Sequence, residues 1–334
     1  MKAIILKEYG GIDNFEMADI PIPSIQKGQV RIKIKAVSFN PVDFQIRKGL
    51  PESKSVTSNI LGKDLSGIVD EVHKDVTDFK KGDEVYGYVC NLASSGTYTE
   101  YISVPSEIIA KKPVILSHEH AASVPVAGIT ASIALAKTKA RSSKSIFIAG
   151  GSGGVGTFSI MLAKQLSLRN LMATAGKDKS FNYLAQDLHL KEKQILNYSD
   201  DKFIKQALER NKGHFDIVLD LVGGKMLSAC CELLAIDGNL ASVVDAPNQN
   251  DFEVLFQKNA SFHSIGANAY SLSENHEEWK TYQHILDHIA NLFESKKLNK
   301  PPITIVGALS VDTVKKAHEL LENNLVQGKL IMAW

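Results

Sequence analysis

Apolar and charged residues alternate through much of the first third of the chain. In segment 29–37, QVRIKIKAV, Val30, Ile32, Ile34 and Ala36 are apolar and charged residues stand between them. This period of two predicts a half-buried strand. Segments 67–72 and 84–89 show shorter runs of the same kind, with glycines between them. Several short strands at this spacing indicate a β-rich barrel or sandwich.

The pattern changes near Ser117, where residues 119–137 become small and apolar with helical periodicity. The run 145–149, SIFIA, is wholly apolar, which is typical of a parallel strand buried on both faces. Further strands and helices are expected to alternate after it, with strands at 170–175, 214–221 and 238–244 and helices at 155–165 and 181–188. Such alternation predicts an α/β fold with a doubly wound parallel sheet and right-handed crossovers.

After about residue 260 the β-rich character partly returns. Amphipathic helices are expected at 279–295 and 311–322, and a strand at 328–334. The simplest architecture inserts the α/β domain, residues 119–258, between two pieces of a β-rich domain, residues 1–118 and 259–334. A length of 334 residues fits two domains, because single cores stop growing near 250–300 residues.

Composition narrows the classes of function. The chain is 44% hydrophobic and 22% charged, with a formal net charge of +1, so neither a nucleic-acid partner nor an anionic membrane is expected. The longest apolar runs are shorter than the ~18 residues of a membrane span, and the N-terminal run 3–6 is too short for a signal peptide. Three cysteines are too few for a disulfide scaffold, so we expect a cytoplasmic protein.

The strongest motif follows the predicted strand 145–149. The segment 149–156, AGGSGGVG, contains G-x-G-x-x-G at Gly151, Gly153 and Gly156, directly before a predicted helix. In this context the first glycine permits a tight turn, the second lets the backbone approach a pyrophosphate, and the third lets the helix pack closely. The motif therefore predicts a Rossmann dinucleotide site, with a flexible connection lacking any ligand as the alternative.

The end of the second strand bears on the choice of dinucleotide. NAD-binding folds usually place Asp or Glu there to hold the ribose 2′-hydroxyl. Here the expected place holds Ala175 or Gly176, and Lys177 and Lys179 follow. Small residues leave room for a 2′-phosphate and lysine supplies charge to it, so NADP(H) is favoured. A solvated loop is the alternative role of the two lysines.

The ordered motifs together resemble the medium-chain dehydrogenase/reductase superfamily, in its zinc-less quinone-oxidoreductase branch. The resemblance spans nearly the whole chain and rests on segments 40–43 (NPVD), 62–67 (GKDLSG), 81–85 (KGDEV), 96–101 (GTYTEY), 126–131 (VAGITA), 149–156 and 220–224 (DLVGG). It implies a GroES-like β-rich domain, a Rossmann domain, a cofactor in the cleft between them, and a homodimer formed through Rossmann sheet edges.

The resemblance also implies roles for individual residues. Those expected to bind the cofactor are Thr130 near the nicotinamide, Gly151, Gly153, Gly154, Val155 and Gly156 at the pyrophosphate, Gly176 with Lys177 or Lys179 at the 2′-phosphate, Tyr198 at the adenosine, Val222 and Gly223 at the nicotinamide ribose, and Asn268 at the carboxamide. For Tyr198, a packing role is the alternative.

Zinc-dependent relatives place Cys, His and Cys where this chain has Asn40, Lys63 and Val126, so the resemblance implies that no metal is bound. His118 and His120 form H-x-H, but we interpret them as polar residues at a helix N-terminus. Without a Lewis acid, hydride transfer to a quinone or to the activated C=C of an enone or enal is favoured, because the acceptor spreads the negative charge.

Asn40 and Lys63 are the candidate catalytic residues. Asn40 is expected to hydrogen-bond the acceptor carbonyl and Lys63 to polarise it, unless Lys63 pairs with Asp64 or Asp43. Proton delivery from solvent is favoured, because Gln45 and Pro51 stand where relatives place a donor. Two rival functions remain: a zinc-less alcohol dehydrogenase, and a non-catalytic cofactor-binding protein of crystallin-like or RNA-binding type.

Overall fold

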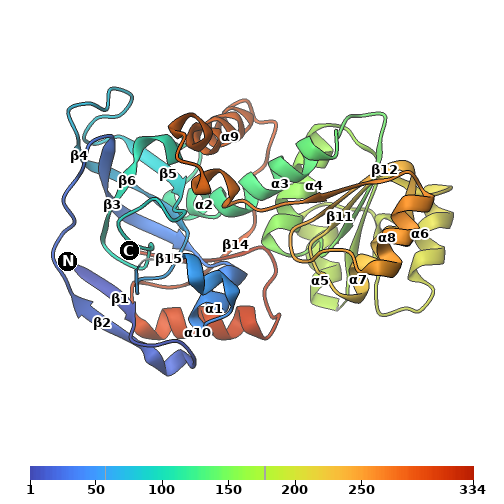
Figure 1. The fold of residues 1–334 in the computed structure, drawn as a ribbon, viewed down its shortest axis with the longest axis horizontal. Helices are drawn as coiled ribbons and strands as arrows, with labels where there is room; N and C mark the ends of the chain where they lie inside the picture. The colour runs from blue at the N-terminus through green and yellow to red at the C-terminus, as the bar shows by residue number, and fades with distance from the viewer. Residues whose placement is uncertain (57, 177) are drawn as a thin grey trace. The chain divides into compact units, whose positions relative to one another are not determined.

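The computed structural model describes residues 1–56, 58–176 and 178–334, and the chain forms two compact units. Unit 1 comprises Met1–Ile129 and Asn268–Trp334, and unit 2 comprises Thr130–Ala267 (Figure 1). Both borders lie somewhat later than the expected 118/119 and 258/259. At the first border the reason is local, because helix α3 (Pro125–Lys137) continues across it.

Unit 1 is built on a seven-stranded sheet of order β14-β15-β3-β4-β5-β7, with β6 also paired to β3. The expected strand at 29–37 is confirmed as β3, whose alternate residues are buried. A separate antiparallel pair, β1 and β2, completes the strands of this unit. Their bounds are β1 Lys2–Leu6, β2 Phe15–Asp19, β3 Gln29–Ser38, β4 Asp64–Val72, β5 Glu84–Tyr88, β6 Tyr101–Pro105, β7 Ile109–Lys111, β14 Ile303–Gly307 and β15 Lys329–Ala333.

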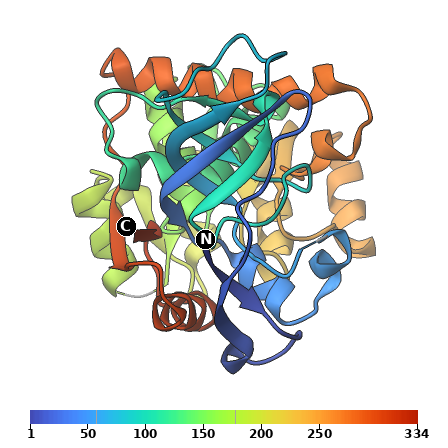
Figure 2. The same cartoon turned by 90° about the vertical axis from the view of Figure 1, so that its left-hand side faces the viewer.

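Helices cover unit 1 on two sides. The long helix α9 and helix α10 lie on opposite sides of the sheet, and both confirm helices expected from periodicity (Figure 2). The segment 119–137 is not one helix but two, because Pro125 disfavours helical backbone in the residue before it. The bounds are α1 Pro41–Arg47, α2 His118–Ala122, α9 His276–Glu294 and α10 Val311–Glu322, with short helices at Ile12–Asn14, Pro51–Ser55, Ser106–Ile108 and Ala269–Leu272.

Unit 2 contains a six-stranded sheet of order β10-β9-β8-β11-β12-β13, and all neighbouring strands are parallel. Numbered along the unit, this is the order 3-2-1-4-5-6 of a Rossmann fold, so the expected fold class is confirmed. The strands are β8 Ser145–Ala149, β9 Arg169–Ala175, β10 Ile195–Asn197, β11 Phe215–Asp220, β12 Leu234–Ser242 and β13 Ser261–Ser264.

One hydrophobic core cluster of unit 2 lies between this sheet and three of its helices. Buried strand residues such as Phe147, Met172 and Val218 pack there against helices α6, α7 and α8. The helix expected at 181–188 is instead a short α-helix followed by a π-helical turn. The bounds are α4 Gly154–Gln165, α5 Asp178–Asn182, the π-helical turn Tyr183–Asp187, α6 Phe203–Asn211, α7 Lys225–Leu233 and α8 Gln249–Gln257. Within the described ranges, no helix has the length and apolar character to cross a membrane.

Candidate cofactor and substrate site

The glycine-rich turn of unit 2 connects β8 to α4. Gly150 has a left-handed backbone with φ +81°, and its amide donates to Thr174 Oγ1 at 2.9 Å. The tight turn was expected at Gly151, but the positive φ belongs to Gly150. At Gly151 a side chain is excluded for another reason, because a Cβ would lie 2.8 Å from the Cβ of Ala173. A Cβ on Gly156 would overlap the Gly150 carbonyl oxygen, so α4 can pack closely on the turn only with glycine there.

Gly153 differs from its neighbours because the protein leaves space beside it. A Cβ there would meet only the carbonyl oxygen of Gly150, at 3.7 Å, so internal packing does not demand a glycine. Gly153 is also the N-cap of α4 and provides no side-chain cap for the amides of Gly154, Val155 and Gly156. Amides at a helix N-terminus attract anions, because they lack intrahelical partners and carry the positive end of the helix dipole. This turn therefore fits a pyrophosphate.

At the end of β9, Tyr198 covers Gly176. A Cβ on Gly176 would overlap Cζ and the hydroxyl oxygen of Tyr198, and the Tyr198 amide donates to the Ala175 carbonyl at 3.3 Å. Tyr198 is nevertheless 47% exposed, so much of its side chain is open to a ligand. Lys179 is exposed on α5, whereas Lys177 lies outside the described residues. The structure thus brings Gly176 and Tyr198 together.

The loop after β11 is held by a buried carboxylate. Asp220 Oδ1 accepts hydrogen bonds from the amides of Val222, at 3.1 Å, and Gly223, at 3.0 Å, while Oδ2 accepts one from Ser242 Oγ at 2.9 Å. Val222 is 49% exposed and lies beside the glycine turn, because a Cβ on Gly150 would be 3.0 Å from its Cγ2.

Three adjacent parallel strands, β9, β8 and β11, therefore bring Gly176, Gly153 and Val222 to the carboxyl edge of one sheet. Strand order reverses at this position, which is where doubly wound sheets bind dinucleotides. Most of the residues expected at the cofactor lie here, in unit 2.

Thr130 and Asn268 stand at the borders of the units. Thr130 is the first residue of unit 2 and is buried in α3, with 6% of its surface exposed. Asn268 belongs to unit 1, where its Oδ1 accepts hydrogen bonds from Ser271 Oγ at 2.8 Å and from the Tyr88 hydroxyl at 3.5 Å. Sequence reasoning did not identify Tyr88 and Ser271, which fix the side chain of Asn268.

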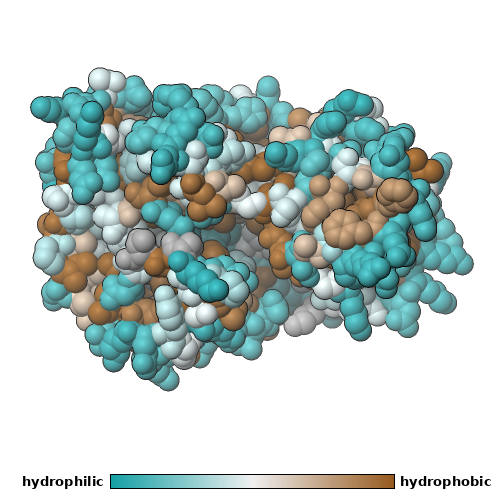
Figure 3. Space-filling view, viewed as in Figure 1, coloured by the Kyte–Doolittle hydropathy of each residue, from teal (hydrophilic) through white to brown (hydrophobic). Residues whose placement is uncertain are grey.

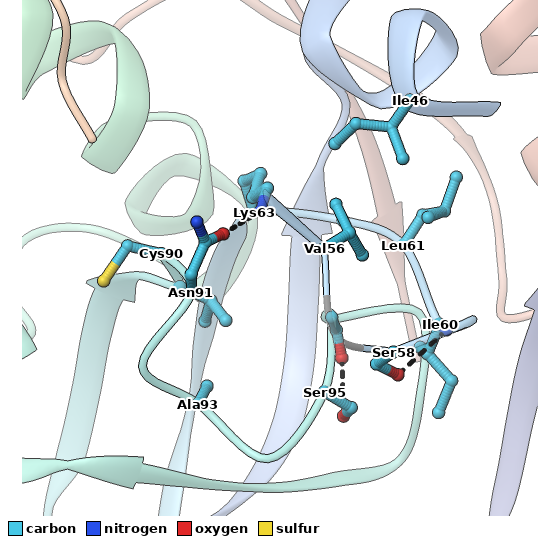
Figure 4. Close-up of a pocket in the computed structure, with 13 residues that line it drawn as sticks. Ile46, Val56, Ser58, Ile60, Leu61, Lys63, Cys90, Asn91, Ala93 and Ser95 are labelled. Atoms are coloured by element: carbon cyan, nitrogen blue, oxygen red, sulfur yellow. Dashed lines mark hydrogen bonds between the residues drawn. The ribbon is translucent and has the colours of Figure 1, made fainter. Parts of the chain in front are cut away.

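A pocket in unit 1 contains the side chain of Lys63 (Figure 4). The ammonium group lies 3.4 Å from Asn91 Oδ1, and these two polar groups face apolar walls formed by Ile46, Val56 and Leu61. Sequence analysis identified Lys63 but not Asn91, which approaches it from the segment after β5. A cation with one amide partner and apolar walls is suited to hold a polar group attached to an apolar molecule.

Burial lowers the pKa of Lys63 below that of an ordinary lysine, with Asp43 and Cys90 opposing the shift. The alternative in which Lys63 pairs with Asp64 or Asp43 is not what the structure contains: among the described residues, no carboxylate lies within ion-pair distance of its ammonium group. Asp64 pairs with Lys329 instead, at 3.0 Å.

Asn40 lies in a buried polar cluster, which we call the Asp64 cluster and which consists of Ser38, Asn40, Asp64, Val126 and Lys329. Asn40 Nδ2 donates to Asp64 Oδ2 at 2.8 Å, and its Oδ1 accepts from Lys329 Nζ at 2.6 Å. Ser38 Oγ also donates to Asp64 Oδ2, and the Val126 amide donates to Oδ1 at 2.7 Å. Both ends of the Asn40 amide are therefore occupied inside the protein, so Lys63 is better placed than Asn40 to meet a substrate.

Asp43 is a second buried carboxylate near these residues. Its Oδ2 accepts the Asn40 amide at 2.8 Å, whereas Oδ1 has no hydrogen-bond partner among the described residues. Burial raises the pKa of Asp43 to about 7, and the Asn40 hydrogen bond and Lys63 only partly offset this shift. Asp43 is therefore expected to exchange a proton near neutral pH.

In the part of the chain that the structure describes, no three His, Cys, Asp or Glu side chains form a group that could hold a metal ion. The two histidines of the H-x-H motif lie in the first turn of α2. His118 contacts Ser66 Oγ at 2.8 Å and Glu84 at 3.3 Å, which accounts for its polar atoms without a metal.

Comparison with known families gives two matches along the chain. Residues 26–126 match the family described as alcohol dehydrogenase GroES-like domain, and residues 190–332 match the family described as zinc-binding dehydrogenase. The first match falls within unit 1, and the second extends from unit 2 into the second segment of unit 1.

Individual relatives match over the whole chain. The 2-methylene-furan-3-one reductase of Solanum lycopersicum is 30% identical, and the NADPH-dependent alkenal/one oxidoreductase, chloroplastic, of Arabidopsis thaliana is 28% identical. Each alignment covers 99% of this chain and 79% of the relative. Among solved structures, the quinone oxidoreductase from Coxiella burnetii is 31% identical with a TM-score of 0.82, and the match covers 100% of this chain and 99% of that one.

Proposed function

Because the chain belongs to the medium-chain dehydrogenase/reductase superfamily, we propose that it is an NADPH-dependent reductase of quinones or of the activated C=C bonds of enones and enals. The names of its relatives support both acceptor classes. The observation that carries the proposal is the open, uncapped N-terminus of α4 at Gly153, located where the strand order of unit 2 reverses.

The cofactor would be held mainly by unit 2. The amides of Gly154, Val155 and Gly156 would bind the pyrophosphate, and Val222 and Gly223 would contact the nicotinamide ribose. Gly176 with Lys177 or Lys179 would bind the 2′-phosphate, and Tyr198 would contact the adenosine. The absence of an acidic side chain at Gly176 favours NADPH over NADH, because a carboxylate there would repel the phosphate. When bound, NADPH supplies the hydride.

Lys63 would bind and polarise the carbonyl of the acceptor. Its ammonium group is oriented by Asn91 within an apolar pocket, where a charged hydrogen bond is stronger than in water. Hydride addition places negative charge on that carbonyl oxygen, so the interaction strengthens as the reaction proceeds. Asn40 would support the site from within the Asp64 cluster, and solvent would supply the final proton.

The proposed reaction uses no metal. At the three positions where zinc-dependent relatives carry ligands, this chain has an amide, an ammonium group and an aliphatic side chain, in Asn40, Lys63 and Val126. Zinc requires thiolate, imidazole or carboxylate ligands, and the cation of Lys63 would repel it. Asn40 is also already bonded to Asp64 and Lys329.

The test is an NADPH-oxidation assay with a panel of quinones, alkenals and small enones, run with and without a metal chelator. We expect acceptor-dependent oxidation, slower turnover with NADH, and no effect of the chelator. Inhibition by the chelator would show that the metal-free assignment is wrong. Absence of turnover with every acceptor, in protein that binds NADPH, would favour the non-catalytic alternative.

We also propose a homodimer formed through unit 2. Strand β13 is at an edge of the six-stranded sheet, and edge strands can pair with another chain. Hydrophobic side chains gather over α8 in Figure 3, where Phe256 is 88% and Phe252 53% exposed. Sedimentation of wild type and Phe256→Glu would test this, with Val114→Glu in unit 1 as the control at an equally exposed site.

A reducing cytoplasmic location is proposed as well. All three cysteines are buried as free thiols, which suits a compartment that does not oxidise them. Imaging of the tagged full chain would show whether the location is cytoplasmic.

A further inference from the structure

The carboxylate of Asp64 has more partners than any other described side chain near Lys63. It is fully buried, and it accepts hydrogen bonds from the side chains of Ser38, Asn40 and Lys329 through Oδ2. Its other oxygen, Oδ1, accepts from the main-chain amide of Val126 at 2.7 Å. The two oxygens therefore have different roles: one joins the strands of unit 1, and the other reaches a helix.

Val126 is the second residue of α3, so Oδ1 of Asp64 bonds to the N-terminal turn of that helix. Pro125 has no amide hydrogen, which makes the Val126 amide the first in the helix that needs a partner. A negative charge at this end also interacts favourably with the helix dipole. Asp64 thus supplies a cap that comes from strand β4, far from α3 in the sequence.

Thr130 lies four residues after Val126, on the same side of α3 and one turn further on. Its position is therefore set by the first turn, which Asp64 holds. We infer that Asp64 is a positioning residue that acts through the first turn of α3 on Thr130. This inference rests on the proposed function and on the expected place of Thr130 near the nicotinamide.

Lys329 and Asn40 serve this arrangement by holding the carboxylate of Asp64 in place. Lys329 is 4% exposed and donates to both Asp64 and Asn40, so the buried carboxylate has a buried cation beside it. Removing only one partner of such a pair leaves an uncompensated buried charge, which destabilises the fold. A test must therefore change the two together.

The experiment is a double-mutant cycle measured as kcat for NADPH oxidation with a responsive acceptor. One change is the charge-balanced pair Asp64→Leu with Lys329→Met, which removes the acceptor of the Val126 amide together with the buried cation, and the other is Thr130→Val, which removes the hydroxyl at nearly constant volume. If Asp64 acts through Thr130, the paired change should lower kcat by about tenfold in the wild-type background and less than about twofold in the Thr130→Val background.

Ser38→Ala is the matched control, because it removes another partner of Asp64 and leaves the bond to Val126. We expect its kcat to stay within about twofold of wild type. Binding of NADPH, followed by fluorescence, should be little changed in Ser38→Ala and in the paired variant, because the pyrophosphate turn belongs to α4. A general loss of structure would instead weaken binding and lower the melting temperature together with kcat.

Two failures are distinguishable. If wild type is active but the effects of the paired change and of Thr130→Val multiply independently, Asp64 does not act through Thr130 and this inference is wrong. If wild type neither binds nor oxidises NADPH, the proposed function itself fails, and the role assigned to Asp64 fails with it.

Discussion

The ring of Tyr198 lies where a side chain on residue 176 would have to go. A Cβ on Gly176 would overlap the ring carbon and hydroxyl oxygen of Tyr198, although that tyrosine remains half exposed. The end of β9 therefore has no acidic residue, and it also has no space for one. Tyr198, from the loop after β10, fills the space that an acidic side chain would need. Two separate positions in the sequence thus act together to keep a carboxylate away from the proposed 2′-phosphate.

The substitution Gly176→Asp should weaken NADPH binding by about tenfold or more, because the new carboxylate must displace Tyr198 and also repels the phosphate. It should not improve NADH binding while Tyr198 is present. Adding Tyr198→Gly should open the space and raise the affinity for NADH above that of the single variant. Fluorescence titrations with both cofactors measure this. Equal NADH affinity in the two variants would show that Tyr198 is not the obstacle.

Two glycines of the turn should respond differently to alanine. At Gly153 the nearest heavy atom to a new Cβ is 3.7 Å away, so Gly153→Ala should fold normally and lose NADPH affinity by about tenfold or more, because the methyl group occupies the pyrophosphate space. At Gly156 the Cβ would overlap the Gly150 carbonyl, so Gly156→Ala should lower the melting temperature. Unchanged NADPH affinity in a folded Gly153→Ala variant would contradict the proposed binding site.

The pH dependence of kcat/KM should report Lys63. Only its protonated form can polarise the acceptor carbonyl, and burial lowers the pKa of Lys63, so activity should fall with rising pH earlier than for an ordinary lysine. Lys63→Met should lower kcat/KM by about 100-fold and remove this alkaline decline. Lys63→Arg should retain part of the activity and move the decline to higher pH, because arginine stays charged. An identical alkaline decline in Lys63→Met would assign it to another group.

The stability of the protein should depend on Asp43 between acid and neutral pH. Burial raises the pKa of Asp43 to about 7 in the folded state, so its contribution to stability is complete below the unfolded value of 3.8 and is lost as pH rises towards 7. In Asp43→Asn this loss should disappear. From pH 4 to pH 8 the unfolding free energy of wild type should therefore fall, relative to the variant, by an amount on the order of 4 kcal/mol.

Denaturant titrations of both proteins across this pH range provide the measurement. His318 titrates with the opposite sign, because burial lowers its pKa to about 3 and its contribution is lost as pH falls. That residue is present in both proteins, so the difference between them isolates Asp43. A difference that does not vary with pH would mean that Asp43 remains ionised in the folded protein.

Strands and helices whose pattern is set by residues adjacent in the chain could be predicted from the sequence. The alternation at 29–37 gave the strand β3, and the apolar run followed by glycines at 145–156 gave β8, the turn and α4. At 29–37 the side-chain pattern has the period of a strand, so burial of one face selects the element, whereas the unbroken apolar run at 145–149 predicts a strand that is buried on both faces. The ends of helices were harder to predict than the helices themselves. Pro125 is the only sequence signal for the break between α2 and α3.

The Asp64 cluster was not predictable in this way. Ser38 and Asp64 meet because β3 and β4 pair in that register, and Lys329 joins them because β15 lies on the other side of β3. From the sequence alone, Lys63 and Asn40 are equally good candidates for a catalytic role. The two residues can be distinguished only in the folded protein. The pairing of distant strands buries Asn40 among hydrogen-bond partners, whereas the side chain of Lys63 lines a pocket.

The place of β15 in its sheet also bears on how the protein is made. This strand lies between β14 and β3, yet it is translated after all of unit 2. Unit 2 can therefore complete its own sheet on the ribosome while the larger sheet still lacks an inner strand. Until Lys329 emerges, the first segment of unit 1 lacks the cation that pairs with Asp64 in the folded protein, so the charge balance of this segment depends on residues translated after unit 2.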